Sequence, residues 1–260
     1  MRSKPKKRLG QNFLVNTKIC KKIIESCCIS KSETVIEIGP GRGELTELLW
    51  RQSKHLIAVE LDRNLSGMLA TRFKANPAVT IVNADFLKLN LEQYLDNSKK
   101  TKIIGNIPYY ITTPIIEKIF SHADSISCAY LTVQKEFAAR LCAQPGSKEY
   151  GSFTCFVRYY SNPKLLFNIK AGSFYPKPKI DSSLVCLDIL EKPPVVVRSP
   201  EEFFSLIGNC FAQRRKTLKN NLKTIFPPPK LEAVFDALGL DKNIRAERLT
   251  LENFAALANF

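Results

Sequence analysis

Histidine and closely spaced cysteines are scarce in this chain of 260 residues. It contains two histidines, His55 and His122, and its eight cysteines are scattered without a single C-x-x-C pair. Metal sites of the zinc type generally need such ligands at short spacings, so we expect no metal site. The cysteines also lack the spacing of a small disulfide framework, which favours free thiols in a reducing cytoplasm.

Long apolar runs are missing as well. No stretch reaches the roughly 18 apolar residues that a membrane-spanning helix requires. No signal-like apolar segment follows the basic start MRSKPKKR. We therefore expect no membrane span and a cytoplasmic location. Hydrophobic residues still make up 45% of the chain, which is enough for a folded core and argues against disorder.

Acidic residues are few relative to basic ones. The chain has 39 Lys and Arg against 24 Asp and Glu, a formal net charge of +15. An excess of this size creates a field that attracts a polyanion. Nucleic acid is the first partner to consider and an anionic membrane surface is the second, while a well-solvated basic surface without a partner is the third alternative.

Five short runs rich in β-branched residues alternate with segments of helical spacing. Each run is typical of a buried strand, and they cover residues 33–39, 55–62, 78–85, 101–106 and 126–134. Helical spacing covers 43–52 and 63–75, and an earlier helix is expected from near Asn16 to Cys27 and Cys28. Strand-helix-strand units of this kind predict an α/β fold whose mostly parallel sheet is covered by helices.

A change of character near residue 192 predicts a domain boundary. The segment EKPPVVVRSP, residues 191–200, is typical of a linker, and the residues beyond it show helical patterns. Ser199, Pro200 and Glu202 have the form of a capping box with proline at the first helical position. We expect an α/β domain in residues 1–192 and a small helical domain in residues 193–260.

A glycine-rich turn follows the first predicted strand and opens a helix in EIGPGRGE. Gly39, Gly41 and Gly43 give the spacing G-x-G-x-G, which differs from the G-x-G-x-x-G of dinucleotide-binding proteins. Glycines here let a ligand approach the backbone closely, so Gly39 and Gly41 are candidate cofactor contacts. A tight turn without a ligand is an equally good interpretation of this loop alone.

Acidic side chains end the next two predicted strands. Glu60 lies about twenty residues beyond the glycine turn, where a carboxylate can accept both hydroxyls of a ribose, and Asp85 ends the third strand. Because the carboxyl ends of parallel strands line one crevice, we expect Gly39, Glu60, Asp85 and Asn106 to converge. The carboxylates would repel phosphates but suit an adenosine with a cationic tail, which is S-adenosylmethionine. Asp85 alone could equally cap a helix.

The segment GNIPYY, residues 105–110, ends the fourth predicted strand with an amide, a proline and two tyrosines. The Asn106 side-chain oxygen and the Pro108 carbonyl could grip the exocyclic amine of a base, and Tyr109 could stack on that base. Acceptors on both hydrogens would aim the nitrogen lone pair of adenine at a methyl group, so catalysis would rest on positioning without a dedicated general base. An ordinary turn is the alternative.

Several motifs together resemble one known family. In chain order they are LGQNFL, VIEIGPGRGELT, VELDR, NAD, GNIPYYITTP, FYPKPKIDSSLV and FAQRRKTLKNNL. They are similar, in order and spacing, to the motifs of the small-subunit ribosomal RNA adenine dimethyltransferases, often called the KsgA family. The resemblance implies a Rossmann-like S-adenosylmethionine-dependent methyltransferase fold with a small C-terminal helical domain. It also implies a monomer that transfers four methyl groups to the N6 atoms of two adjacent adenosines near the 3′ end of small-subunit rRNA, late in subunit assembly.

The same resemblance implies roles for individual residues. The cofactor contacts of the family fall on Asn12, Leu14, Gly39, Glu60, Asp85 and Asn106. The target-base site falls on Asn106, Ile107, Pro108 and Tyr109. Phe174 matches the aromatic residue that faces the base from the other side, although from the residues alone it could equally belong to the core.

A basic segment in the C-terminal part is the candidate RNA surface. Residues 211–223 are expected to form one helix with Phe211, Leu218, Leu222 and Ile225 facing inward. Its outer face would carry Arg214, Arg215, Lys216, Lys219 and Lys223, which is typical of phosphate binding. A solvated face is the alternative. The basic tail residues Arg2, Lys4, Lys6, Lys7 and Arg8 could likewise clamp RNA or remain solvated.

Two rival functions share these features. An antibiotic-resistance methyltransferase that acts on large-subunit rRNA would carry the same catalytic motif, but FYPKPKID and QRRKTLKNNL favour the small-subunit group. A non-catalytic assembly or transcription factor would be expected to show decay of the glycine turn or of NIPY. Both motifs are intact here, which favours an enzyme.

Overall fold

The computed structural model describes residues 5–6, 9–95, 100–223 and 225–260. The chain divides into two compact units. One contains residues 1–138 and 164–191, and the other contains residues 139–163 and 192–260. The expected division at residue 192 therefore needs a correction, because it assigned the segment 139–163 to the first unit.

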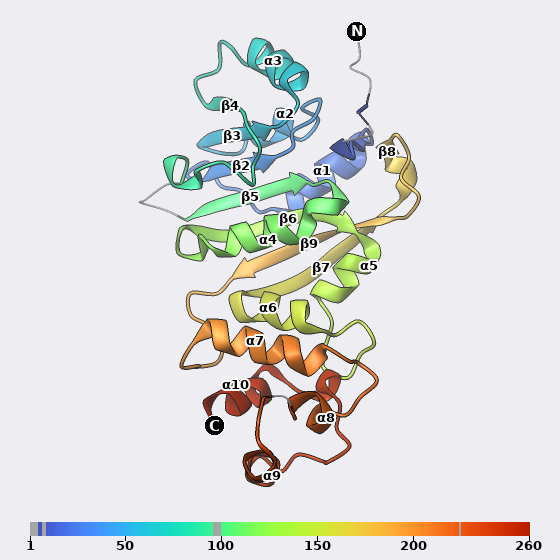
Figure 1. The fold of residues 1–260 in the computed structure, drawn as a ribbon. Coiled ribbons are helices and arrows are strands. Elements are labelled where there is room, and N and C mark those ends of the chain that lie inside the picture. The colour runs from blue at the N-terminus through green and yellow to red at the C-terminus, as the bar shows by residue number, and fades with distance from the viewer. Residues whose placement is uncertain (1–4, 7–8, 96–99, 224) are drawn as a thin grey trace. The chain divides into compact units, whose positions relative to one another are not determined.

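A seven-stranded sheet forms the centre of the first unit (Figure 1). Its strand order is β4-β3-β2-β5-β6-β9-β7. The strands are β2 (Thr34–Ile38), β3 (His55–Glu60), β4 (Val79–Asn83), β5 (Thr101–Asn106), β6 (Ile126–Gln134), β7 (Ser161–Ile169) and β9 (Ser182–Ile189). The pairs from β4 to β6 are parallel and β9 is antiparallel to β6, so the five predicted strands and the mostly parallel sheet are confirmed.

Burial on both faces explains why the central strands appear in the sequence as nearly continuous apolar runs. All five residues of β2 and the first five of β5 are buried, as expected for strands covered on both faces. A buried cluster that includes Val35, Leu56 and Ile104 fills the space under the helices. Two charged residues interrupt these runs: Glu37 in β2 is 1% exposed and Lys102 in β5 is 8% exposed.

Five helices in the described part of the chain accompany the sheet. They are α1 (Thr17–Ser26), α2 (Thr46–Leu49), α3 (Arg63–Arg72), α4 (Thr112–Phe120) and α5 (Lys135–Leu141), the last of which extends into the second unit. Helices α2, α3 and α4 lie between successive parallel strands. Helix α1 starts where it was expected, and Asn16 caps it by accepting hydrogen bonds from the backbone N–H groups of Lys18 and Ile19. A separate two-stranded ribbon pairs β1 (Phe13–Leu14) with β8 (Phe174–Tyr175).

Helices make up the second unit. They are α6 (Ser152–Tyr160), α7 (Pro200–Phe211), α8 (Leu218–Leu222), α9 (Pro228–Ala237) and α10 (Leu251–Asn259). Ser199 caps α7 by accepting from the Glu202 N–H, with Pro200 at the first helical position. The core of this unit contains fully buried Tyr150 from the 139–163 segment together with Phe203.

The single helix expected over residues 211–223 is wrong. Helix α7 ends at Phe211, a turn covers residues 212–217, and α8 starts after Thr217. The Thr217 side chain accepts from the Asn220 N–H and so begins a new helix instead of continuing the old one. Leu218 and Leu222 are buried as expected, but Ile225 is 39% exposed.

Across the described ranges, the structure contains no helix that is both long and apolar enough to span a membrane.

Candidate active site

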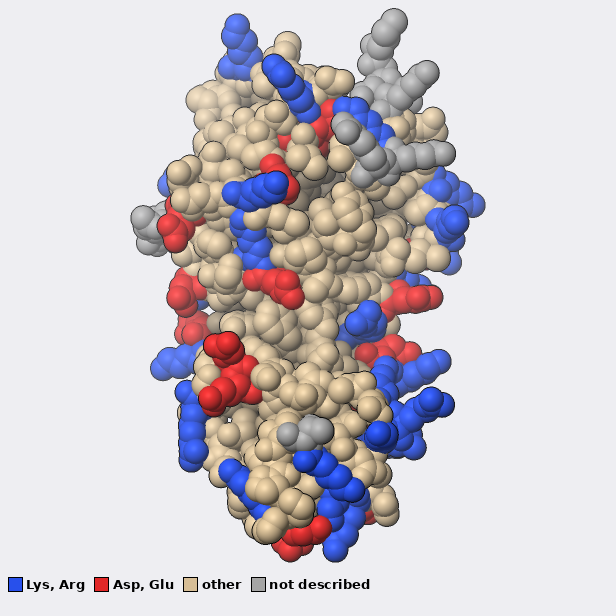
Figure 2. All heavy atoms as spheres, viewed as in Figure 1, with Lys and Arg blue, Asp and Glu red and all other residues tan. Residues whose placement is uncertain are grey.

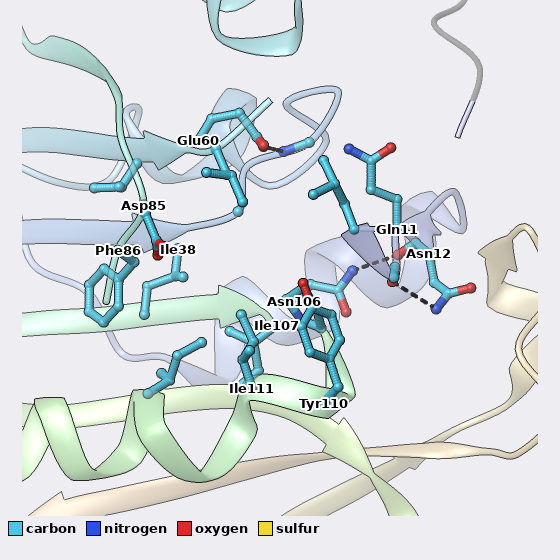
Figure 3. A pocket seen from close by; sticks show the side chains of 18 of the residues that line it. Gln11, Asn12, Ile38, Glu60, Asp85, Phe86, Asn106, Ile107, Tyr110 and Ile111 are labelled. Atoms are coloured by element: carbon cyan, nitrogen blue, oxygen red, sulfur yellow. Dashed lines mark hydrogen bonds between the residues drawn. The ribbon is translucent and has the colours of Figure 1, made fainter. Parts of the chain in front are cut away.

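The carboxyl ends of the central strands open onto one cavity in the first unit (Figure 3). The four strand-end residues that were expected to converge all line it: Gly39, Glu60, Asp85 and Asn106. Their convergence follows from parallel pairing, because β3, β2 and β5 run in one direction and end at the same edge of the sheet. Other residues that the sequence placed in the site and that line the cavity are Asn12, Gly41, Ile107, Pro108 and Tyr109.

Glu60 clamps the glycine turn. One carboxylate oxygen accepts a hydrogen bond from the Gly41 N–H at 2.9 Å, and the other accepts from the Asp62 N–H at 2.8 Å. Burial raises the pKa of Glu60, and these backbone N–H groups oppose that rise because they stabilise the carboxylate. Each oxygen retains a second lone pair, so the fixed carboxylate can still accept from a ligand hydroxyl.

Gly41 lies where only glycine fits. Its φ is +60°, a conformation that L side chains rarely adopt, and a Cβ built on it would lie 2.9 Å from the Phe13 ring. The turn can therefore pass directly beneath Phe13 and bring its backbone to the cavity wall. The close approach inferred from the G-x-G-x-G spacing has a steric reason here.

Glu37 lies beneath this turn and is only 1% exposed. One oxygen of its carboxyl group accepts a hydrogen bond from the Thr46 hydroxyl at 2.7 Å. Burial, opposed by the Thr46 bond and aided by the nearby carboxylates Glu60 and Glu44, raises the pKa of Glu37 to about 8. A proton therefore resides on Glu37 over much of the neutral range.

This buried acid predicts a pH dependence of stability. The folded protein keeps the Glu37 proton up to about pH 8, whereas the unfolded chain releases it near 4.5. The folded state binds more protons between these values, so the contribution of Glu37 to the free energy of unfolding falls as the pH rises from 4.5 to 8. Urea unfolding at several pH values should show this fall, and Glu37→Gln should reduce it. An unchanged pH slope in Glu37→Gln would contradict the assignment.

Asn106 is tied to the N-terminal segment. Its side-chain Nδ2 donates a hydrogen bond to the Asn12 carbonyl oxygen at 2.9 Å (Figure 3). Because the amide nitrogen is held in this way, the Oδ1 atom on the other side is oriented as an acceptor at the cavity. Asn12 in turn donates from its own side chain to the Gly10 carbonyl at 3.3 Å.

The turn after Asn106 positions a carbonyl and an aromatic ring. Pro108 has φ −60° and ψ 132°, and its carbonyl accepts from the Ile111 N–H at 3.2 Å, which leaves its second lone pair for a ligand. The Tyr109 hydroxyl shares a hydrogen bond of 2.7 Å with the Ser182 hydroxyl. Burial raises the pKa of Tyr109. The hydrogen bond to Ser182 therefore anchors the ring at its hydroxyl end, and the raised pKa keeps the hydroxyl protonated.

Sequence reasoning missed an aromatic wall beside Asp85. Phe86 is 5% exposed and lines the cavity, and it follows directly after the acidic residue that ends the strand region. Asp85 accepts from the Leu87 N–H at 3.0 Å with one oxygen, so it caps a local turn and also faces the cavity. An aromatic residue next to a strand-end carboxylate was the signal that could have identified this wall.

No sequence pattern indicated how the N-terminal segment is held. Lys6 Nζ forms an ion pair with Asp62 at 2.8 Å, and the Gln11 side chain donates to the other Asp62 oxygen at 3.2 Å. Burial would raise the pKa of Asp62, but the Lys6 bond and the Asn64 N–H together lower it. Lys6 is thus an internal contact. The remaining basic tail residues, Arg2, Lys4, Lys7 and Arg8, lie outside the described residues.

Comparisons with known proteins agree with this geometry. The family model described as "Ribosomal RNA adenine dimethylase" matches residues 2–260. The chain belongs to the ribosomal RNA adenine dimethylase family. A relative from Geobacillus thermodenitrificans named Ribosomal RNA small subunit methyltransferase A is 41% identical over 98% of this chain and 90% of its own length. A relative of the same name from Clostridium botulinum (strain Okra / Type B1) is 40% identical over 97% and 92%.

Solved structures of related enzymes share the fold. A dimethyladenosine transferase from Plasmodium falciparum superposes with a TM-score of 0.82 at 28% identity, over 94% of this chain and 95% of that one. The 23S rRNA methyltransferase ErmE gives a TM-score of 0.76 at 25% identity, over 95% and 98%. The expected Rossmann-like methyltransferase fold is therefore confirmed.

The cavity fits the cofactor of this dimethylase family, S-adenosylmethionine. Gly39 and Gly41 let the backbone come close to a ligand, and Glu60 and Asp85 place carboxylates where a cation is favoured over a phosphate. Phe86 offers an apolar wall for an adenine ring. Among the residues that the structure describes, no group of three His, Cys, Asp or Glu side chains is arranged to bind a metal ion.

Leu14 and Phe174 do not line the main cavity. They face each other in the β1–β8 pair, and both are 3% exposed in the apolar core. Leu14 still lines a smaller cavity together with Gly39 and Asn106. Phe174 lines neither cavity and its ring packs in the apolar core, so its expected place opposite the base stays a prediction. The exposed aromatic neighbour is Tyr175, at 54%.

Proposed function

We propose that this protein transfers methyl groups from S-adenosylmethionine to the N6 atoms of two adjacent adenosines near the 3′ end of small-subunit rRNA, within an assembling subunit. The observation that carries the proposal is that Asn106, Pro108 and Tyr109 line the same cavity as Glu60. We also infer that the protein acts as a monomer in the cytoplasm.

The residues of the cavity divide between the two reactants. When bound, S-adenosylmethionine supplies an electrophilic methyl group on a positively charged sulfur. Glu60 would accept from ribose hydroxyls, and its bond to Gly41 keeps the glycine turn in place while it does so. Tyr109 would stack on the target adenine, with its ring fixed by Ser182.

The amide and the carbonyl would act on the nucleophile. The adenine amine is a weak nucleophile because its lone pair is drawn into the ring. In the first transfer, Asn106 Oδ1 and the Pro108 carbonyl would each accept one N6 hydrogen, which favours a more tetrahedral nitrogen with its lone pair directed at the methyl carbon. In the second transfer N6 carries one hydrogen, and one of the two acceptors would hold it. The N6 proton leaves to solvent after transfer, so positioning by these acceptors does not require a general base.

The RNA surface that we propose is narrower than the sequence indicated. Arg214 donates to the Lys148 and Tyr150 carbonyls and pairs with Glu247 at 3.5 Å, and Lys219 pairs with Glu232. Both side chains therefore already have partners within the second unit. The exposed candidates that remain are Arg215, Lys216 and Lys223. Figure 2 shows Lys and Arg gathered over the region that Figure 1 labels α8 and α9.

Removal of the three exposed charges should weaken RNA binding in a salt-dependent way. In a triple variant with Arg215→Ala, Lys216→Ala and Lys223→Ala, the slope of log affinity against log salt should shrink by about 2, at about 0.7 for each phosphate contact to a single strand. Filter binding of small-subunit rRNA at several salt concentrations measures it. The matched control carries Lys18→Ala, Lys21→Ala and Lys74→Ala, which are exposed in the first unit. An equal change in the control would show that only net charge matters.

Methylation of undermethylated small subunits tests the proposed function. The purified protein is incubated with labelled S-adenosylmethionine and either small or large subunits, and the rRNA is digested to nucleosides. We expect labelled N6,N6-dimethyladenosine from small subunits, with primer extension stopping at two adjacent adenosines. Label in large subunits alone would instead assign the activity that the name of ErmE describes. No label in either would leave a non-catalytic role.

A further inference from the structure

Tyr110 is an exposed aromatic residue at the rim of the cavity. Its side chain is 63% exposed, yet it lines the same cavity as Asn106 and Tyr109. It follows Tyr109 within one short 3-10 turn (Tyr109–Ile111), so one tyrosine points into the half-buried interior and the next lies at the opening. Tyr110 takes no part in the methyl transfer proposed for Asn106, Pro108 and Tyr109.

The ring of Tyr110 is backed by the N-terminal segment. Gly10 has φ +59°, and a Cβ built on it would lie 3.1 Å from Tyr110 Cε1 and 3.5 Å from Pro108 Cβ. The absence of a side chain at Gly10 thus lets the backbone lie against the ring. Figure 3 shows Tyr110 beside Asn106, below the labelled Gln11 and Asn12 of this segment.

Contacts on both sides of Gly10 hold this backing in place. Before Gly10 in the chain, Lys6 pairs with Asp62; after it, Gln11 bonds to the same carboxylate and the Asn12 carbonyl accepts from Asn106. The ring is therefore supported on one side by anchored backbone and is open to solvent on the other. An aromatic surface that is fixed before its ligand arrives loses little conformational entropy on binding.

We propose that Tyr110 is a stacking platform for the base of a nucleotide that flanks the target adenosine. The inference rests on the proposed function and extends it to a second base. When one nucleotide enters the cavity, its neighbour in a single strand must lie near the opening, where Tyr110 offers its exposed face. Stacking on an aromatic ring accepts any base, because each base has a π-face. The cofactor does not compete for this ring, since Glu60, Asp85 and Phe86 lie on other elements of the cavity.

A ring-specific series of variants tests the platform. Tyr110→Phe keeps the ring, Tyr110→Leu keeps an apolar side chain without a ring, and Tyr110→Ala removes both. For undermethylated small subunits we expect KM to rise about 5- to 150-fold in Tyr110→Ala and Tyr110→Leu, the range that stacking supports elsewhere, with Tyr110→Phe close to the unaltered protein. The rate at saturating subunits and the affinity for S-adenosylmethionine should change little.

Three further measurements distinguish stacking at Tyr110 from a general loss of aromatic surface or of folding. Tyr94→Ala is the matched control, because Tyr94 is a partly exposed tyrosine of the same unit that lines a different hollow with His55 and Thr80. Gly10→Ala should raise KM in the same direction, since its Cβ would press on the ring. Melting temperatures establish that each variant is folded.

The outcomes distinguish a failure of the Tyr110 platform from a failure of the proposed methyl transfer. If Tyr110→Leu matches Tyr110→Phe, the side chain is an apolar filler and the platform is wrong. If Tyr110→Ala keeps the KM of the unaltered protein, the platform is also wrong, while the proposed function stands. If the unaltered protein methylates no small subunits, the proposed function itself fails.

Discussion

Replacement of Asn106 by Ala should lower methyl transfer by about 100- to 1,000-fold, the loss typical of removing one preorganised hydrogen-bonding group from a reacting centre. The structure supplies the reason, because the Nδ2 bond to Asn12 fixes Oδ1 as the acceptor at the cavity. Single-turnover methylation at saturating subunits and cofactor measures the chemical step. Affinity for S-adenosylmethionine should fall much less, since Glu60 and the glycine turn remain.

Asn106→Asp is the informative companion to Asn106→Ala. If Asn106 only shaped a turn, Asp would replace it well. In the structure, however, Asp would place a carboxylate oxygen against the Asn12 carbonyl where an N–H group now donates. We therefore expect Asp to lose both the anchoring bond and the transfer activity in a folded protein. Full turnover in a stably folded Asn106→Ala variant would overturn the proposed role of this amide.

Glu60→Ala should have the second largest effect. It removes the acceptor for two backbone N–H groups, those of Gly41 and Asp62, in a residue that is 6% exposed. A buried donor left without a partner costs about 1–3 kcal/mol, so we expect both lower stability and a weaker cofactor site. Calorimetric affinity for S-adenosylmethionine should fall by roughly tenfold or more, the equivalent of about 1.4 kcal/mol.

The control for Glu60→Ala is Glu92→Ala, an exposed acid of the same unit. It removes the same charge without touching the glycine turn. Urea unfolding measures the loss of stability. The cofactor titration is carried out well below the unfolding midpoint, so it measures the loss of affinity in the folded protein. Unchanged cofactor affinity in a folded Glu60→Ala protein would remove Glu60 from the site.

The sheet and the strand-end convergence could be predicted because both follow from local patterns. Buried parallel strands appear as short apolar runs, and their common direction brings Glu60 and Asn106 to one edge wherever the strands pair. The hydrogen bond that Glu60 makes at this edge could not be predicted from the sequence in the same way. Its bond to Gly41 depends on the path of a turn nineteen residues earlier, which no spacing rule encodes.

The failures of prediction share a physical cause, which is competition between local signals and distant contacts. Residues 211–223 have helical spacing, but the Thr217 cap restarts the helix. Arg214 and Lys219 resemble a solvent-facing basic stripe, yet acidic partners far along the chain engage both. The β1–β8 ribbon, which pairs Leu14 with Phe174, was not predicted at all, because a single sequence carries no sign of it.

The division of the chain into units has a consequence for protein engineering and for recombination between related genes. The polypeptide leaves the first unit near residue 138, returns near 164 and leaves again near 191, so the helical unit is assembled from two separate stretches. A fragment that starts at residue 193 would lack Tyr150, Cys155 and Tyr159, which fill the core around Phe203. A chimera between two family members would therefore need both stretches from the same parent, and recombination at a single crossover in the linker would give a helical unit with a mismatched interior.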